Sequence, residues 1–91
     1  MERFADLSRE IPGLMSARLE VPPGSRYAGR VLGETHARTL TGASVVAVVR
    51  GSEVIASPAP MQPLEAGDVL VVIGTEAGVA GVRRLLAQPG R

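Results

Sequence analysis

The chain has 91 residues, which is enough for one small domain with a single apolar core. Apolar residues make up 45% of the sequence but aromatic residues only 2%, so Val, Ile, Leu and Ala must build that core. Such a thin core favours packing against a second copy of the chain. The net charge of +1 gives no field that would hold nucleic acid or an acidic membrane surface. With no cysteine and one histidine, disulfides, thiol nucleophiles and typical metal centres are excluded.

The sequence also carries no signal for a membrane or secreted protein. Its longest apolar stretches, residues 45–49 and 69–73, are far shorter than the roughly 20 residues that span a bilayer. The first residues include acidic side chains and no long apolar run, so they are not a signal peptide. We therefore expect a cytoplasmic domain that has no cofactor and does not insert into a membrane.

Residues 1–16 are predicted to form an N-terminal helix or linker segment, and residues 17–91 the main domain. Pro12 and Gly13 should end the helix near Ile11. A lone domain offers such an amphipathic segment little to pack against, which fits the tail of a longer linker or an element that swaps between protomers. The apolar residues that recur at helical spacing are Phe4, Leu7, Ile11 and Leu14.

The next elements are a short strand and a helix. Residues 19–21 alternate apolar and polar side chains, as a strand does, and a Pro-Pro-Gly sequence stops them. Residues 31–41 carry apolar anchors separated by good helix formers. We predict one helix over this range, closed by Thr41 and Gly42.

The second half of the chain gives the clearest pattern. Two β-branched runs, 44–50 and 53–57, are joined by Gly51 and Ser52 and predict a tight hairpin. Residues 57–68 contain three prolines and predict a loop. The run 68–74 begins with Asp68 and is otherwise apolar, so we expect a strand buried on both faces, one by helices and one by a partner or another layer.

Thr75 is a good N-cap for a last helix that reaches about Leu86. Together the elements predict an α+β fold: a small sandwich of a mostly antiparallel sheet with helices packed on it, with a βαβββα core and a dimeric assembly.

Residues with chemical potential are few. His36 and Arg38 lie in the predicted helix, where they could contact an anion or be ordinary half-exposed residues. Arg30, Arg38 and Arg50 lie near the ends of elements and could converge on phosphates, although scattered surface arginines are the more common explanation. Asp68 is expected to fix its turn by accepting hydrogen bonds from backbone amides. Since no nucleophile is paired with a base, we expect no enzymatic activity.

Three glycines near the last helix, Gly74, Gly78 and Gly81, resemble a phosphate-binding loop only superficially. Their spacing fits neither the dinucleotide-binding nor the P-loop pattern. We expect them to allow close packing of the helix on the sheet.

Over residues 18–86 the order and spacing of these features resemble the TrkA C-terminal domain, also called RCK_C. The segments that carry the resemblance are VPPGSRYAGRVLGETHAR, TGASVVAVVRGSEVIASPAP and LEAGDVLVVIGT. The individual positions that fit the family pattern are Gly29, Arg30, Leu32, Arg38, Gly42, Val46, Ala47, Val48, Arg50, Ile55, Pro58, Leu64, Gly67, Asp68, Leu70, Val72 and Gly74. Thr35 and Ala37 depart from it, because many members carry larger aliphatic residues there.

The resemblance implies a regulatory domain of a potassium channel or of a potassium or cation/proton antiporter, and it is closest to the regulatory subunits of antiporters. It implies a homodimer that binds a small nucleotide, such as cyclic di-AMP, in a cleft at its interface. The partner would be a membrane transporter or channel subunit. The ligand-binding residues that it implies are His36, Arg38, Val45, Arg50, Ile55, Ser57 and Pro58. The alternative is a structural dimerisation or docking module without a ligand.

Overall fold

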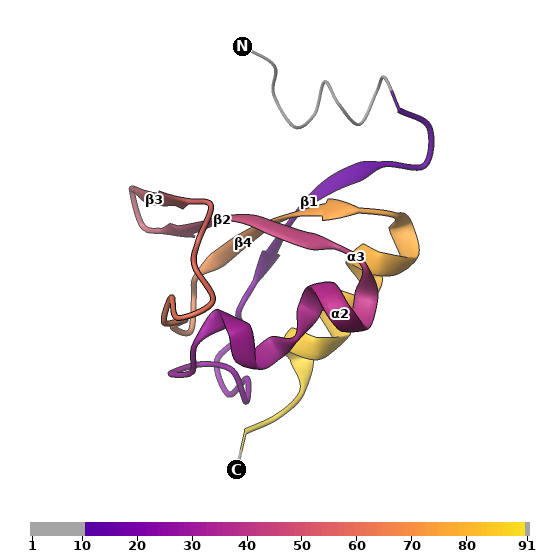
Figure 1. Cartoon of the computed structure of the whole chain (residues 1–91). Coiled ribbons are helices and arrows are strands. Elements are labelled where there is room, and N and C mark those ends of the chain that lie inside the picture. Colours follow the sequence, from indigo (N-terminus) through magenta and orange to yellow (C-terminus); the bar gives the residue numbers. More distant parts are fainter. Residues whose placement is uncertain (1–10, 91) are drawn as a thin grey trace.

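The computed structural model describes residues 11–90, which form one four-stranded sheet with helices packed on it (Figure 1). The elements in chain order are β1 (Met15–Glu20), the 3₁₀ helix η1 (Leu32–Thr35), α2 (Ala37–Thr41), β2 (Ser44–Arg50), β3 (Glu53–Ala56), β4 (Val69–Gly74) and α3 (Glu76–Ala87). The strand order is β1-β4-β2-β3, and every neighbouring pair is antiparallel. The predicted α+β class and antiparallel sheet are confirmed.

The core lies between one face of the sheet and the helices. Alternate strand residues such as Leu19, Val48 and Val72 are buried there, and they cluster with side chains of α3 such as Val79 and Val82. This alternation follows from the strand geometry, which points successive side chains to opposite faces. No helix among residues 11–90 combines the length and the apolar character that are needed to cross a membrane.

The turn predicted at Pro12 and Gly13 is present: residues 11–13 form a turn, in which Gly13 has a φ of 85°. The first strand, which was predicted over residues 19–21, is longer than expected and begins earlier. Strand β1 begins at Met15, because its residues pair in register with β4 from Met15↔Gly74 to Glu20↔Val69. The rest of the predicted helix lies outside the described residues.

The predicted helix 31–41 is wrong as a single element. The chain forms η1, then His36 adopts a left-handed conformation (φ 49°, ψ 33°), and α2 follows. The side chain of Thr35 accounts for the break, because its Oγ1 donates to Leu32 O (2.8 Å) and accepts from Ala37 N (3.1 Å). Such local bonds give the backbone an alternative to the helix ladder. The predicted C-terminal end of this helix is correct, since Gly42 caps α2 with a φ of 80°.

One face of β4 is buried as expected, and the expectation that a partner or another layer covers the other face stays a prediction. Leu70, Val72 and Gly74 are buried, whereas Val69, Val71 and Ile73 are partly exposed in the single chain. The helices therefore cover one face of this central strand, and its other face is covered only in part.

The predicted start of the last helix is confirmed. The three glycines near it do allow close packing, but against the end of α2 and the residue pair that follows it, not of the helix on the sheet as expected. Thr75 Oγ1 accepts a hydrogen bond from Gly78 N (3.0 Å) and caps α3. A Cβ atom at Gly74 would lie 2.8 Å from the Cβ of Ala43, and one at Gly78 would lie 2.9 Å from Thr41 O. These distances leave no room for a side chain, so the glycines set how closely α3 and the sheet approach the segment around Thr41.

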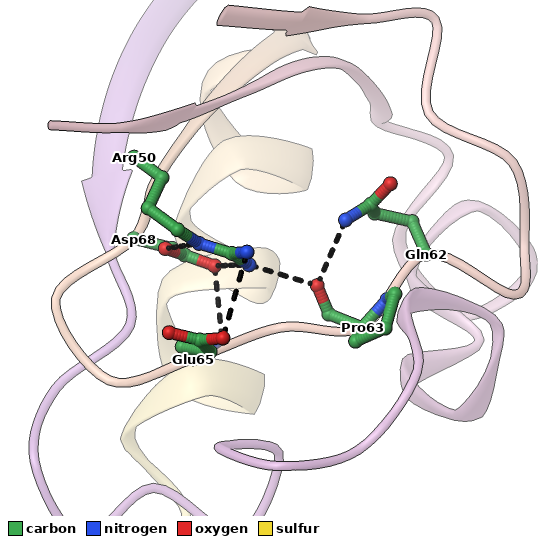
Figure 2. A network of polar contacts seen from close by, with 5 residues as sticks. All are labelled: Arg50, Gln62, Pro63, Glu65 and Asp68. Atoms are coloured by element: carbon green, nitrogen blue, oxygen red, sulfur yellow. Dashed lines mark hydrogen bonds and ion pairs between the residues drawn. The ribbon is translucent and has the colours of Figure 1, made fainter. Parts of the chain in front are cut away.

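A polar network closes the loop that joins β3 to β4 (Figure 2). Asp68 is 1% exposed, and its two carboxylate oxygens accept hydrogen bonds from Arg50 Nε and Nη2, both 2.8 Å long. Arg50 Nη2 also donates to Pro63 O (3.1 Å), and Glu65 N donates to Asp68 Oδ2 (2.8 Å). The predicted role of Asp68 in its turn is thereby confirmed. The hydrogen bonds from Arg50 hold the pKa of Asp68 below its usual value.

Replacing Gly78 with Ala should destabilise the fold by about 1–3 kcal/mol, because the new methyl group overpacks against the backbone oxygen of Thr41. Helix propensity alone predicts the opposite, a gain of about 1 kcal/mol. Urea unfolding measures the difference in the free energy of unfolding between the variant and the wild type. The variant Ala77→Gly, at an exposed position of α3, is the control that measures helix propensity alone. A stabilised Gly78→Ala variant would contradict the packing role.

The charge of Asp68 should make the fold sensitive to acid. Its pKa is lower in the folded chain, so its contribution is complete above the unfolded value of roughly 3.9 and is lost as the pH falls through the lower folded value. Asp68→Asn should therefore be less stable than the wild type at pH 7. The difference in the free energy of unfolding between the two proteins should become smaller below about pH 5. Urea unfolding of both proteins across this range tests it, and a gap that stays constant with pH would refute the assignment.

Candidate functional site

A hollow of about 440 Å³ lies where η1 and α2 meet the start of β2 and the loop after β3. Its apolar wall consists of Leu32, Val45, Pro58 and Pro60, and its polar side chains include Thr35, His36, Arg38 and Ser44. Residues that are far apart in the sequence therefore meet at one site.

Two left-handed residues that are not glycine shape the edges of this hollow. His36 turns the chain from η1 into α2, and Ser57 (φ 49°) turns it from β3 toward Pro58. Such a conformation is uncommon for residues with a side chain and costs of order 1–3 kcal/mol, so it persists only where neighbouring contacts enforce it. At Ser57 the contact is the hydrogen bond from its amide to Val46 O (2.9 Å).

The basic side chains among the lining residues are His36 and Arg38, and none of the lining residues of the described chain is acidic. Both basic side chains are exposed, so they are accessible to a ligand. A guanidinium group binds phosphate or carboxylate oxygens in a bidentate manner. The site can accordingly hold an anion beside a flat apolar group. Within residues 11–90 no group of three His, Asp or Glu side chains could hold a metal ion.

The structure brings together His36, Arg38, Val45 and Pro58 of the predicted ligand-binding residues. The other three do not line the hollow. Arg50 is bonded to Asp68, Ile55 packs against the core, and Ser57 precedes the lining residue Pro58.

Sequence reasoning missed other residues that line the hollow, such as Leu32, Ser44 and Pro60. These side chains carry no charge, and although Leu32 fits the family pattern, nothing in the sequence assigned any of the three to a binding site. The only signal for Pro60 was its place in the proline-rich loop, which indicated a loop but not the direction in which the loop runs.

Residues 17–87 match the family of the TrkA-C domain. The Ktr system potassium uptake protein C of Bacillus subtilis (strain 168) is 36% identical over 62 residues, which are 68% of this chain and 28% of that protein. The chain thus spans little more than a quarter of the length of this curated relative.

Solved structures with the same fold include two bound to c-di-AMP. The RCK C domain of the potassium transport protein KtrA has a TM-score of 0.75 and 27% identity, with 89% of each chain covered. The RCK_C domain dimer of S. agalactiae BusR has a TM-score of 0.71 and 28% identity, with 78% of this chain and 93% of that chain covered. BusR has also been solved with its busAB promoter DNA, and this chain covers 35% of the BusR chain in that complex.

The family match includes β1 from residue 17 onward, the other three strands and the whole of α3, and the fold agrees with that of solved RCK_C domains. The chain therefore belongs to the TrkA-C (RCK_C) family of regulatory domains.

Proposed function

We propose that this domain binds a cyclic dinucleotide such as c-di-AMP at a dimer interface and reports its presence to a potassium or cation/proton transport protein. One observation carries the proposal. The hollow that holds His36 and Arg38 between apolar walls lies in a fold whose relatives KtrA and BusR were solved with c-di-AMP.

The chemistry of the hollow suits the two parts of such a ligand. A cyclic dinucleotide has phosphates, which the guanidinium of Arg38 and the imidazole of His36 can contact. It also has flat purine bases, for which Val45 and Pro58 offer apolar surface. Because no lining residue of the described chain is acidic, no carboxylate repels the phosphates there.

A second copy of the chain completes the site in this proposal. A cyclic dinucleotide with two identical halves suits a two-fold dimer, since each protomer presents the same side chains to one half of the ligand. The c-di-AMP complex of BusR contains a dimer of RCK_C domains, which supports the same arrangement here.

The regulated partner is then a membrane cation transporter or channel subunit, to which the domain binds from the cytoplasm. The similarity to a potassium uptake protein supports this partner. A ligand controls such a partner only if it binds one dimer geometry more tightly than another. DNA is not proposed as a partner of this domain: its net charge is only +1, and the DNA complex of BusR involves a chain of which this domain covers 35%.

Excess c-di-AMP should raise the melting temperature of the chain, because a ligand that binds only the folded state stabilises it. At a free concentration one hundred times its Kd the gain is about 2.7 kcal/mol. In a domain of this size that corresponds to a shift of roughly 10 °C or more. Scanning fluorimetry with c-di-AMP, and with AMP as the control nucleotide, measures it. If no nucleotide shifts the transition, the domain is a structural dimerisation or docking module instead.

Arg38→Ala should weaken c-di-AMP binding by about tenfold or more, the loss expected when a hydrogen bond to a charged group is removed. The matched control is Arg83→Ala, which removes the same charge from an exposed position on α3 outside the hollow. Titration calorimetry of the two variants and the wild type gives the affinities, and circular dichroism checks that each variant is folded. Equal affinities for the two variants would remove Arg38 from the site.

A further inference from the structure

One wall of the hollow belongs to a loop that has no strand or helix of its own. Pro58 and Pro60 form this wall, and both lie in the segment 57–68 between β3 and β4. Proline has no amide hydrogen, so this loop has few donors with which to hold itself. Two backbone hydrogen bonds lie within the loop, from Gln62 N to Ala59 O and from Asp68 N to Glu65 O, and bonds to neighbouring segments do the rest.

The first set of bonds joins the loop to η1, whose residues Leu32 and Gly33 also line the hollow. Gly33 N donates to Pro60 O, and Leu32 N donates to Gln62 O, both over 2.8 Å. A Cβ atom at Gly33 would lie 3.1 Å from both the Cβ and the carbonyl oxygen of Pro60, so the two walls approach about as closely as a glycine permits. This pairing fixes where Pro60 lies beside η1 at the hollow.

Arg50 provides the second attachment, from the sheet side (Figure 2). Its Nη2 donates to Pro63 O over 3.1 Å, while Nε and Nη2 bind the two oxygens of the buried Asp68. Pro63 also forms an isolated β-bridge with Val31, directly before η1. One guanidinium group thus connects the end of β2 and the start of β4 to the middle of the loop.

We propose that Arg50 is a positioning residue for the hollow, which it does not itself line. By holding Pro63 it keeps the segment 60–63 paired with residues 31–33, and so it keeps Pro60 against Gly33. The role of the hollow in binding a ligand rests on the proposed function, but the coupling between Arg50 and the wall does not.

The competing interpretation is a direct contact between Arg50 and the ligand. The bonds to Asp68 and Pro63 already occupy Nε and Nη2. The remaining terminal nitrogen, Nη1, lies 3.5 Å from Glu65 Oε2, whose negative charge repels a phosphate. These bonds favour an indirect role.

Hydrogen exchange tests the coupling without any ligand. In Arg50→Ala the amides of Leu32 and Gly33 should exchange about tenfold faster or more, relative to the amides of β1 in the same protein. A core variant, Leu86→Val in α3, serves as the control for general loss of stability and should accelerate both groups of amides alike. If Leu32 and Gly33 in Arg50→Ala keep their protection relative to β1, the proposal is overturned.

Affinity for c-di-AMP gives the second readout, measured well below the melting temperature of each variant. Arg50→Ala should bind about tenfold more weakly, whereas Leu86→Val should bind like the wild type. A weaker affinity with unchanged amide protection would overturn the positioning role in favour of direct contact. If the wild type itself binds no c-di-AMP, the proposed function fails, and amide exchange alone decides the role of Arg50.

Arg50→Lys tests the same proposal in case Arg50→Ala does not fold. Lysine keeps a positive charge beside Asp68, but a compact ammonium group cannot bind both carboxylate oxygens and Pro63 O as the planar guanidinium does. This variant should fold and still show faster exchange at Gly33. Full protection at Gly33 in Arg50→Lys would contradict the proposal, because it would mean that the bridge to Pro63 is dispensable.

Discussion

A carboxylate that is almost completely buried constrains the architecture of this domain. Burying a charge costs several kcal/mol unless a partner and hydrogen bonds replace the lost water. Asp68 obtains them from Arg50 and from the amide of Glu65. Arg50 is the last residue of β2, and Asp68 directly precedes β4. Their pairing therefore fixes where β4 begins relative to the point at which β2 ends. The loop between β3 and β4 must then close over the pair, and its proline-rich part runs toward η1 and α2.

The candidate site follows from this arrangement. The hollow lies where the short helices η1 and α2 and the loop after β3 meet the start of β2. Loops that a regular scaffold positions commonly take part in binding sites. The left-handed backbone at His36 and Ser57 marks two edges of the hollow, and its cost must be met by the surrounding contacts. A site built in this way depends on bonds between loops, which explains why a residue outside the hollow can influence it.

The sequence was sufficient to predict the parts of the fold that depend on local pattern. The hairpin of β2 and β3, the strand β4 and the cap at Thr75 all follow from β-branched runs, turn residues and a capping side chain. The position of the break at His36 could not be predicted, because Glu34, Ala37 and Arg38 around it are good helix formers. It arises from the side-chain bonds of Thr35 and from the tertiary pairing of Gly33 with Pro60.

The site was predictable only in part, for a related reason. The family resemblance indicated His36, Arg38, Val45 and Pro58, which the structure brings to one hollow. It could not separate arginines that face a ligand from arginines that face a carboxylate.

Arg50 binds Asp68, which lies 18 residues away, and no local pattern identifies that partner. Arg30 instead pairs with Glu34, only four residues further along the chain, over 2.9 Å. Which arginines remain accessible in the hollow is therefore a property of the tertiary structure.

The central claim is that one cyclic dinucleotide is shared by two copies of this chain. Its most direct test is the binding stoichiometry of c-di-AMP by titration calorimetry, combined with sedimentation of the complex. The account predicts one ligand for every two chains and a complex with the mass of a dimer. A ligand bound by each chain as a monomer, or a titration with no binding heat and no change in mass, would contradict it.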